Sequence, residues 1–158
     1  MNKQIELIQG KRWLNNLVRD INANYALTLN FADTMVEAQD YEKDREKAER
    51  IIGHGLLRLC KKVGTNRNPA NLLRVVVIDR GKKSKQLHAH MALRLEGYDL
   101  DDAHKLIFNC WTATKGASKA LSRFDCQRIY GNGWEGYLGK TITHAGFNEY
   151  DDKNSRTV

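Results

Sequence analysis

The sequence predicts an α+β fold in which an antiparallel sheet of about five strands carries helices packed on one of its faces. Strand-like segments occur at 25–31, 71–80, 86–95 and 120–130, and segments with helical periodicity separate most of them. Only a short loop, GKKSK, joins the second and third strands. Such a short connection allows an antiparallel pair and excludes a parallel crossover, which indicates an α+β sandwich in place of a doubly wound fold.

The first half of the chain is expected to contain two helices around one strand. Residues 3–21 carry apolar side chains at helical spacing, which predicts an N-terminal helix that is broken or bent near Gly10. The segment YALTLNF, 25–31, alternates large apolar residues with small or polar ones and predicts a half-buried strand. A long amphipathic helix follows from Asp40 and stops at Gly64.

The second half is expected to begin with a hairpin. Residues 71–80 are rich in β-branched side chains, and residues 86–95 supply the antiparallel partner. The acids Asp99 to Asp102 suit the start of an amphipathic helix. A further strand at 120–130 precedes a short helix in WEGYLGKTITHAG, and the polar tail is expected to be frayed.

Length and composition indicate one domain, 1–158, with an N-terminal helical segment at 1–22, a core at 25–144 and a polar tail at 145–158. The cysteines lie outside any C-x-x-C pair, which favours reduced thiols that pack in the interior; they are Cys60, Cys110 and Cys126. Neither a signal peptide nor a membrane-spanning run is recognisable. We therefore expect a cytoplasmic protein.

The charge pattern suggests a nucleic-acid partner. The net charge is +7, and the basic excess is concentrated in CKKVGTNR, 60–67, and RGKKSK, 80–85. Clusters of this kind commonly contact phosphates, although solvated loops are the simpler interpretation. The nucleic-acid interpretation is favoured here because both clusters flank the strand that contains two histidines.

His88 and His90 lie two residues apart in that strand, so their side chains project from the same face of the sheet. Two neutral imidazoles at this spacing can bind one cation, although they can also be a polar pair on an exposed face. Asp79, at the end of the partner strand, is the expected third ligand; its alternative role is to anchor the loop. Two imidazoles and a carboxylate suit Mn²⁺ or Mg²⁺ better than a structural zinc, although zinc would also bind.

The late helix carries a tyrosine and a lysine that share a face. Tyr137 and Lys140 are one turn apart, with Thr141 and His144 on the same side. Beside a metal, a tyrosine can act as nucleophile and a lysine as the cation for the same phosphate. Tyrosine and lysine also share helix faces in many proteins where they have no catalytic role. The pair therefore indicates an active site only together with the metal site and the basic segments.

Taken together, these segments resemble the HUH endonuclease superfamily, and most closely its single-tyrosine rolling-circle replication initiators. ALTLNF, 26–31, looks like the first motif of the initiators, and LHAHMAL, 87–93, contains histidine, one small residue and histidine, as in the name-giving motif. GYLGK, 136–140, matches the Y-x-x-K motif. The resemblance spans residues 25–144, and the order and spacing of the three motifs carry it.

The resemblance implies a ferredoxin-like or palm-like HUH endonuclease fold, an antiparallel sheet with helices behind it. It also implies a metal-dependent enzyme that nicks and joins single-stranded DNA at a specific site. His88 and His90 with Asp79 would hold the metal, and Glu135 and His144 remain alternatives to Asp79. Tyr137 would attack the phosphate, leaving a 5′-phosphotyrosine and a free 3′-hydroxyl that primes replication of a plasmid or phage, and Lys140 would stabilise the transition state. The candidate DNA contacts are Thr28, Asn30, Arg80, Lys82, Lys83 and Lys85.

Three other functions stay open. An HUH-type single-strand transposase would share the chemistry but usually carries a glutamine where Lys140 stands, and a relaxase usually has an N-terminal tyrosine and three clustered histidines. A non-catalytic ferredoxin-like module that binds single-stranded DNA or RNA would need exposed aromatics on its sheet. A host helicase as a second partner and the oligomeric state also stay open, and no membrane contact is expected.

Overall fold

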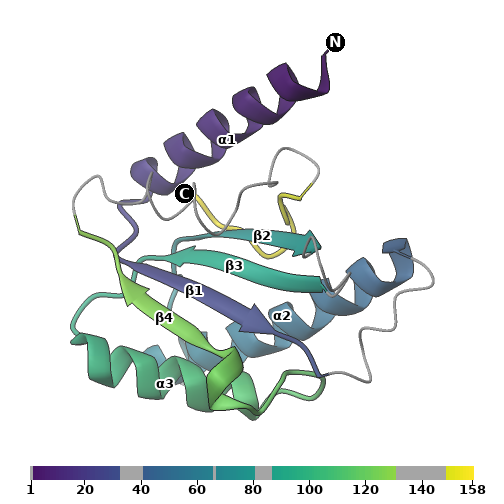
Figure 1. Cartoon of the computed structure of the whole chain (residues 1–158). Helices are drawn as coiled ribbons and strands as arrows, with labels where there is room; N and C mark the ends of the chain where they lie inside the picture. The colour runs from purple at the N-terminus through teal and green to yellow at the C-terminus, as the bar shows by residue number, and fades with distance from the viewer. Residues whose placement is uncertain (1, 33–40, 66, 81–86, 131–148) are drawn as a thin grey trace.

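The computed structural model describes residues 2–32, 41–65, 67–80, 87–130 and 149–158 of the chain (Figure 1). The elements in chain order are α1 (Lys3–Asp20), β1 (Tyr25–Asn30), α2 (Tyr41–Val63), β2 (Arg74–Arg80), β3 (Leu87–Leu93), α3 (Leu100–Thr112), the 3-10 turn η2 (Leu121–Arg123) and β4 (Asp125–Arg128). The predicted α+β class is confirmed.

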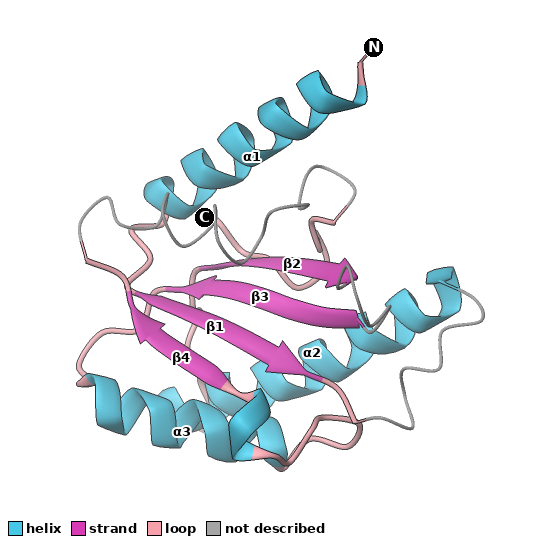
Figure 2. Ribbon diagram, in the orientation of Figure 1, coloured by secondary structure: helices cyan, strands magenta, loops and turns pink. Residues whose placement is uncertain are grey.

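The sheet is open and antiparallel, with the strand order β2-β3-β1-β4 (Figure 2). Within the described residues it has four strands, one fewer than the number predicted. The predicted hairpin of β2 and β3 is confirmed, and the expected strand at 120–130 is shorter because its first residues form η2. The sheet edges are therefore β2 and β4.

Helices α2 and α3 cover one face of the sheet and enclose the larger core (Figure 1). Each strand contributes alternate large side chains to this core, among them Leu27, Ile78 and Met91. Asp99 caps α3 by accepting a 2.8 Å hydrogen bond from the backbone N–H of Asp102, which confirms the predicted start of that helix. This packing fixes the strands in place, and the side chains on their other face form the candidate site.

Helix α1 packs on the other face of the sheet, so the prediction that the helices lie on one face is wrong for this helix (Figure 1). Leu14, Val18 and Ile21 meet short apolar side chains of the strands in a second, smaller core. The strand residues of that core are Ala26, Val75, Val77 and Ala92. The face that bears the histidines is thus partly covered by protein.

The predicted break of α1 near Gly10 is absent, since the helix is continuous from Lys3 to Asp20 and Gly10 is buried within it. The side chain of Asn2 accepts a 3.0 Å hydrogen bond from the N–H of Gln4 and caps the first turn. A single glycine lowers helix stability by only about 1 kcal/mol relative to alanine. Packing of the C-terminal half against the sheet is sufficient to offset this.

Helix α2 ends directly before Gly64, as predicted, and the reason is a close approach of two backbone segments. A Cβ atom at position 64 would lie 2.4 Å from the backbone oxygen of Asn68 and from the backbone nitrogen of Ala70. The N–H groups of Gly64 and Ala70 both donate to the carbonyl of Cys60. Only glycine lets the chain turn this tightly into β2.

The C-terminal residues 149–158 are ordered along the outer edge of β2, and the prediction that they are frayed is wrong. The backbone of Arg156 exchanges two hydrogen bonds with Arg74, and the N–H of Ile78 donates to the carbonyl of Glu149 at 2.8 Å. The N–H of Asp151 donates to Val76, whose own N–H donates to Ser155 Oγ at 2.9 Å. The tail therefore pairs with backbone N–H and C=O groups along the outer edge of β2.

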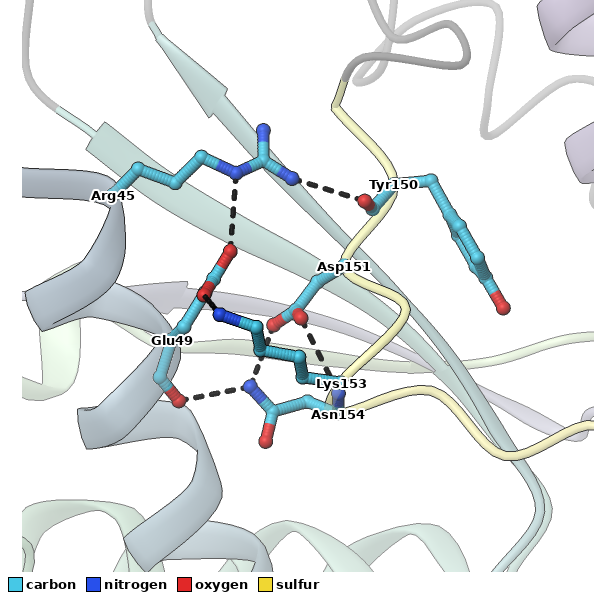
Figure 3. A network of polar contacts seen from close by, with 6 residues as sticks. All are labelled: Arg45, Glu49, Tyr150, Asp151, Lys153 and Asn154. Carbon is cyan, nitrogen blue, oxygen red and sulfur yellow. Dashed lines mark hydrogen bonds and ion pairs between the residues drawn. The ribbon is translucent and has the colours of Figure 1, made fainter. Parts of the chain in front are cut away.

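A polar network fixes this tail to α2 (Figure 3). Asp151 is fully buried and accepts two hydrogen bonds from Asn154, whose amide also donates to the backbone carbonyl of Glu49 at 2.8 Å. Arg45 donates to the carbonyl of Tyr150, and Lys153 contacts the Glu49 carboxylate at 3.0 Å. Burial raises the pKa of the Asp151 carboxyl, while the bonds from Asn154 partly offset the shift.

We expect Asn154→Ala to lower the free energy of unfolding by about 1–3 kcal/mol at pH 7, because the buried Asp151 carboxylate loses a donor. Since the pKa of Asp151 is raised in the folded state, the native protein binds a proton before the unfolded chain does, and the loss shrinks as the pH falls toward the unfolded value of about 4. Urea unfolding at several pH values measures both effects. The exposed Asn71→Ala is the control, and an equal loss in both variants would contradict the network.

The three cysteines are free and buried, in agreement with their predicted role in packing. Burial, with a smaller contribution from Asp125, raises the pKa of the Cys126 thiol to about 12. In the part of the chain that the structure describes, every helix is too short or too polar to cross a membrane.

Candidate metal site

The register of the sheet brings Asp79, His88 and Asn30 into one row across three strands. Asp79 of β2 lies opposite His88 of β3, which in turn lies opposite Asn30 of β1. In the next row on the same face, His90 lies between Val77 and Thr28. Because side chains alternate along a strand, both histidines and Asp79 project to the face that α1 packs on.

These side chains converge at one point. One ligand atom from each of Asp79, His88 and His90 can be chosen so that all three atoms lie within 4.8 Å of one another. Nε2 of His88 is 3.8 Å from Oδ2 of Asp79, which is too long for a hydrogen bond. The two imidazole rings are 4.8 Å apart, edge to face. The three groups thus surround a common space without bonding to one another across it.

His90 is the most informative member of the group. It is 2% exposed, and its Nδ1 lies 3.3 Å from Oγ1 of Thr28. Its Nε2 is buried and has no hydrogen-bond partner among the described residues. Buried ring nitrogens are normally satisfied, so an unpaired one requires an explanation. In the tautomer with the proton on Nδ1, the ring donates to Thr28 and Nε2 keeps a lone pair.

The electrostatics of the site keep this lone pair available. Burial, followed by the nearby His88, lowers the pKa of His90 to about 3. The ring is therefore neutral at physiological pH, which is the form that binds a metal. Asp79 is also buried, at 6% exposure, and supplies the negative charge that a buried cation needs.

The residues present fit a divalent cation. The three donor atoms lie within 4.8 Å of one another, whereas two ligands of one ion can be at most about 4.2 Å apart when each metal–ligand bond is about 2.1 Å. Small rotations of these side chains would therefore bring them to bonding distance of one ion. Thr28 would hold the His90 ring in place, as partners of metal-bound histidines commonly do. Asp79, His88 and His90 would hold Mn²⁺, Mg²⁺ or Zn²⁺, and the remaining positions of the ion would be left for substrate or water.

The structure does not bring all of the predicted residues into this group. The side-chain amide of Asn30 donates to the backbone carbonyl of Arg123 and joins β1 to η2, so Asn30 has a structural role. Arg80 is the last residue of β2, and its side chain is not described. The remaining predicted site residues lie outside the described residues: Lys82, Lys83, Lys85, Glu135, Tyr137, Lys140 and His144.

Sequence reasoning missed one residue near the site and one contact of a residue that it had named. Asp125 of β4 lies opposite Thr28 and thus on the histidine face, where it accepts a 2.9 Å hydrogen bond from Gln127. Thr28, predicted as a DNA contact, touches the His90 ring, a contact that the sequence pattern does not indicate. Both placements depend on the register of strands far apart in the sequence, and no local pattern indicates that register.

Comparisons with protein-family models, curated protein sequences and solved structures found no match to this chain. The geometry of the site and the three sequence motifs are therefore the features that bear on function.

Proposed function

We propose that the protein is a metal-dependent endonuclease that nicks and rejoins single-stranded DNA through a tyrosine-linked intermediate, and that it initiates rolling-circle replication. The observation that supports this most is the buried, unpaired Nε2 of His90 beside His88 and Asp79. Two histidines separated by one residue, with a carboxylate opposite them, are what the HUH resemblance requires. The basic composition supports a nucleic-acid substrate.

In this proposal the described residues prepare the site. His90 stays neutral because it is buried, Thr28 fixes its ring, and Asp79 balances the charge of the cation. When bound, the cation would draw electron density from the oxygens of the scissile phosphate. His88, which is half-buried, lies on the more solvent-accessible side of the group.

Tyr137 and Lys140 complete the proposal, although both lie outside the described residues. The phenol oxygen of Tyr137 would form a bond to phosphorus while the bond to the 3′-oxygen breaks. The phenol proton is lost and the 3′-oxygen gains one, so a free 3′-hydroxyl and a 5′-phosphotyrosine result. A free phenol has a pKa of about 10, and the Lys140 ammonium would favour its ionised form. Reversal of the same step rejoins the strand.

A purely binding role is disfavoured by the described part of the histidine face. Modules that bind single strands stack bases on exposed aromatic side chains. The strand residues beside the histidines, such as Thr28 and Asn30, carry no aromatic ring on which a base could stack. The rings of Trp13 and Tyr150 pack against each other, 4.8 Å apart and edge to face, so each covers part of the other. A single-strand transposase would use the same covalent step, so the choice between replication and transposition rests on the Y-x-x-K motif alone.

A covalent-trapping experiment tests the proposal. The protein is incubated with a randomised single-stranded DNA pool and Mn²⁺, and adducts are resolved on a denaturing gel. We expect a mass-shifted adduct that disappears in Tyr137→Phe. The matched control is Tyr130→Phe, because Tyr130 is 74% exposed and close by in the sequence, and this variant should retain the adduct.

Two other results of the trapping experiment would contradict the proposal. An adduct that persists in Tyr137→Phe would assign a different nucleophile. The absence of any adduct, with DNA binding that does not depend on metal, would favour a non-catalytic module. Sequencing of the DNA attached to the wild-type protein would identify the target.

A further inference from the structure

A row of basic side chains follows the exposed side of α2. This helix covers the face of the sheet opposite the candidate metal site (Figure 1). The spacing of three or four residues places the basic side chains on one side of the helix, and all are exposed. They are Lys47, Arg50, His54, Arg58 and Lys61. At a rise of about 1.5 Å per residue, this basic row is about 21 Å long.

The C-terminal part of the row borders a groove. Arg58, Lys61 and Lys62 line a groove of about 480 Å³ between α2 and α3, opposite Leu106 and Asn109. Within the described ranges, no carboxylate forms an ion pair with these three cations. The groove therefore presents positive charge that the described part of the protein does not neutralise.

The acidic residues of α2 lie in its N-terminal half, away from the C-terminal end of the basic row. Glu49 forms ion pairs with Arg45 of α2 and with Lys153 of the C-terminal tail, and Asp44 is buried. The exposed acids Glu42 and Glu46 lie in the first two turns. The exposed charged side chains from Arg50 to Lys62 are thus all basic and surround an exposed Leu57, and clustered basic charge of this kind is the electrostatic pattern of a phosphate-binding surface.

We propose that this surface of α2, with the groove beside α3, binds the phosphate backbone of double-stranded DNA. A basic row about 21 Å long can reach several phosphates of a duplex, which carries one negative charge per about 1.7 Å of its axis when both strands are counted. Single-stranded DNA is a poorer match, because the groove is lined without aromatic side chains on which bases could stack. Binding would not depend on base sequence, since cations that contact phosphates position a duplex without reading it.

This surface is separate from the candidate metal site, so its test does not depend on the proposed nicking activity. The affinity for a blunt duplex is measured in EDTA at several salt concentrations, for the wild type and for Arg50→Gln/Arg58→Gln/Lys61→Gln. Each lost phosphate contact lowers the slope of log K against log salt by about 0.9. We expect the magnitude of the slope to fall by about 2–3 in the variant.

Two controls separate this result from an effect of net charge or folding. Lys3→Gln/Lys11→Gln/Arg12→Gln removes the same charge from α1, on the other face of the sheet, and should change the slope by less than 1. Arg50→Lys/Arg58→Lys keeps the charge and should keep the slope. Circular dichroism of each variant confirms that the helices are intact.

Three outcomes would overturn the proposal. Equal slopes in the α2 and α1 variants would make the basic row an ordinary solvated surface. A change confined to single-stranded DNA would assign the surface to a single strand. Binding of polyglutamate that the α2 substitutions abolish, without any effect on duplex binding, would assign it to an acidic protein.

Discussion

Replacing both His88 and His90 by alanine is expected to lower the affinity for Mn²⁺ by about 100-fold or more, to the point where calorimetry detects no binding. Removal of groups that merely orient metal ligands already lowers affinity by about 10–100-fold, and loss of two ligands should exceed this. Titration calorimetry at pH 7 measures the affinity. The stabilisation of the wild type by Mn²⁺ gives a second readout, because saturating ligand at about 100 times Kd adds about 2.7 kcal/mol.

The matched control removes two other imidazoles. His54 is exposed on α2 and His104 is half-buried on α3, and neither belongs to the convergent group. His54→Ala/His104→Ala should therefore bind Mn²⁺ as the wild type does. Unchanged Mn²⁺ affinity in His88→Ala/His90→Ala would remove the basis for the metal site, and with it the main support for the proposed nicking activity.

The same titration identifies the third ligand. If Asp79 is the ligand, Asp79→Asn should lower the affinity by about 10-fold or more, whereas Glu135→Gln and His144→Gln should leave it unchanged. Asp79 is favoured because it lies directly opposite His88 and within the group of three donor atoms. If only Glu135→Gln or only His144→Gln lowers the affinity, that residue is the third ligand in place of Asp79.

Most of the secondary structure was predictable because its signals are local. The alternation in residues 25–31 and the β-branched run before Asp79 encode β1 and β2, and the acids at 99–102 encode the start of α3. The pair of histidines was predictable for the same reason, since two residues at i and i+2 of a strand share a face. Local patterns also indicated the end of α2 at Gly64, although the sequence does not show the close contact with Asn68.

The register between strands was not predictable from the sequence. Asp79 and His88 are nine positions apart across a loop, and a shift of one residue would have moved Asp79 to the other face of the sheet. The orientation of His90 depends on Thr28, which is 62 positions away. Contacts of this kind are set by the packing of the whole sheet, so sequence reasoning could name candidates without showing that they converge.

Two errors have a common physical cause, which is that polar or small residues can be buried when their partners are in place. Ala26, Val77 and Ala92 lie beside polar residues on the histidine face, yet they provide enough apolar surface for α1. The tail has a polar composition typical of a frayed end, yet Asp151 and Asn154 are buried because they bond to each other and to α2. Composition does not reveal such pairings.

The environment of His90 should also make the stability of the metal-free protein depend on pH. The ring lies between Thr28 and Val77 on the neighbouring strands. Among the described residues of the sheet, the titratable groups that the register places beside it on this face are His88 and Asp79, with Asp125 beyond Thr28. Its pKa is about 3 in the folded state, against about 6.5 in the unfolded chain. Below pH 6.5 the unfolded chain therefore binds a proton that the native protein does not, so stability is lost as the pH falls.

We expect this single group to remove about 2–3 kcal/mol of stability between pH 6 and pH 4, since each pH unit in this window contributes about 1.4 kcal/mol. Urea unfolding in EDTA gives the free energy of unfolding of the wild type and of His90→Gln at each pH. Carboxylates titrate in both proteins, so the difference between the two curves isolates His90. His88→Gln, which retains His90, should keep the steep pH dependence. A difference curve that is flat from pH 6 to pH 4 would mean that His90 takes up a proton in the folded state, and its Nε2 would then be a donor in place of a lone pair held ready for a metal.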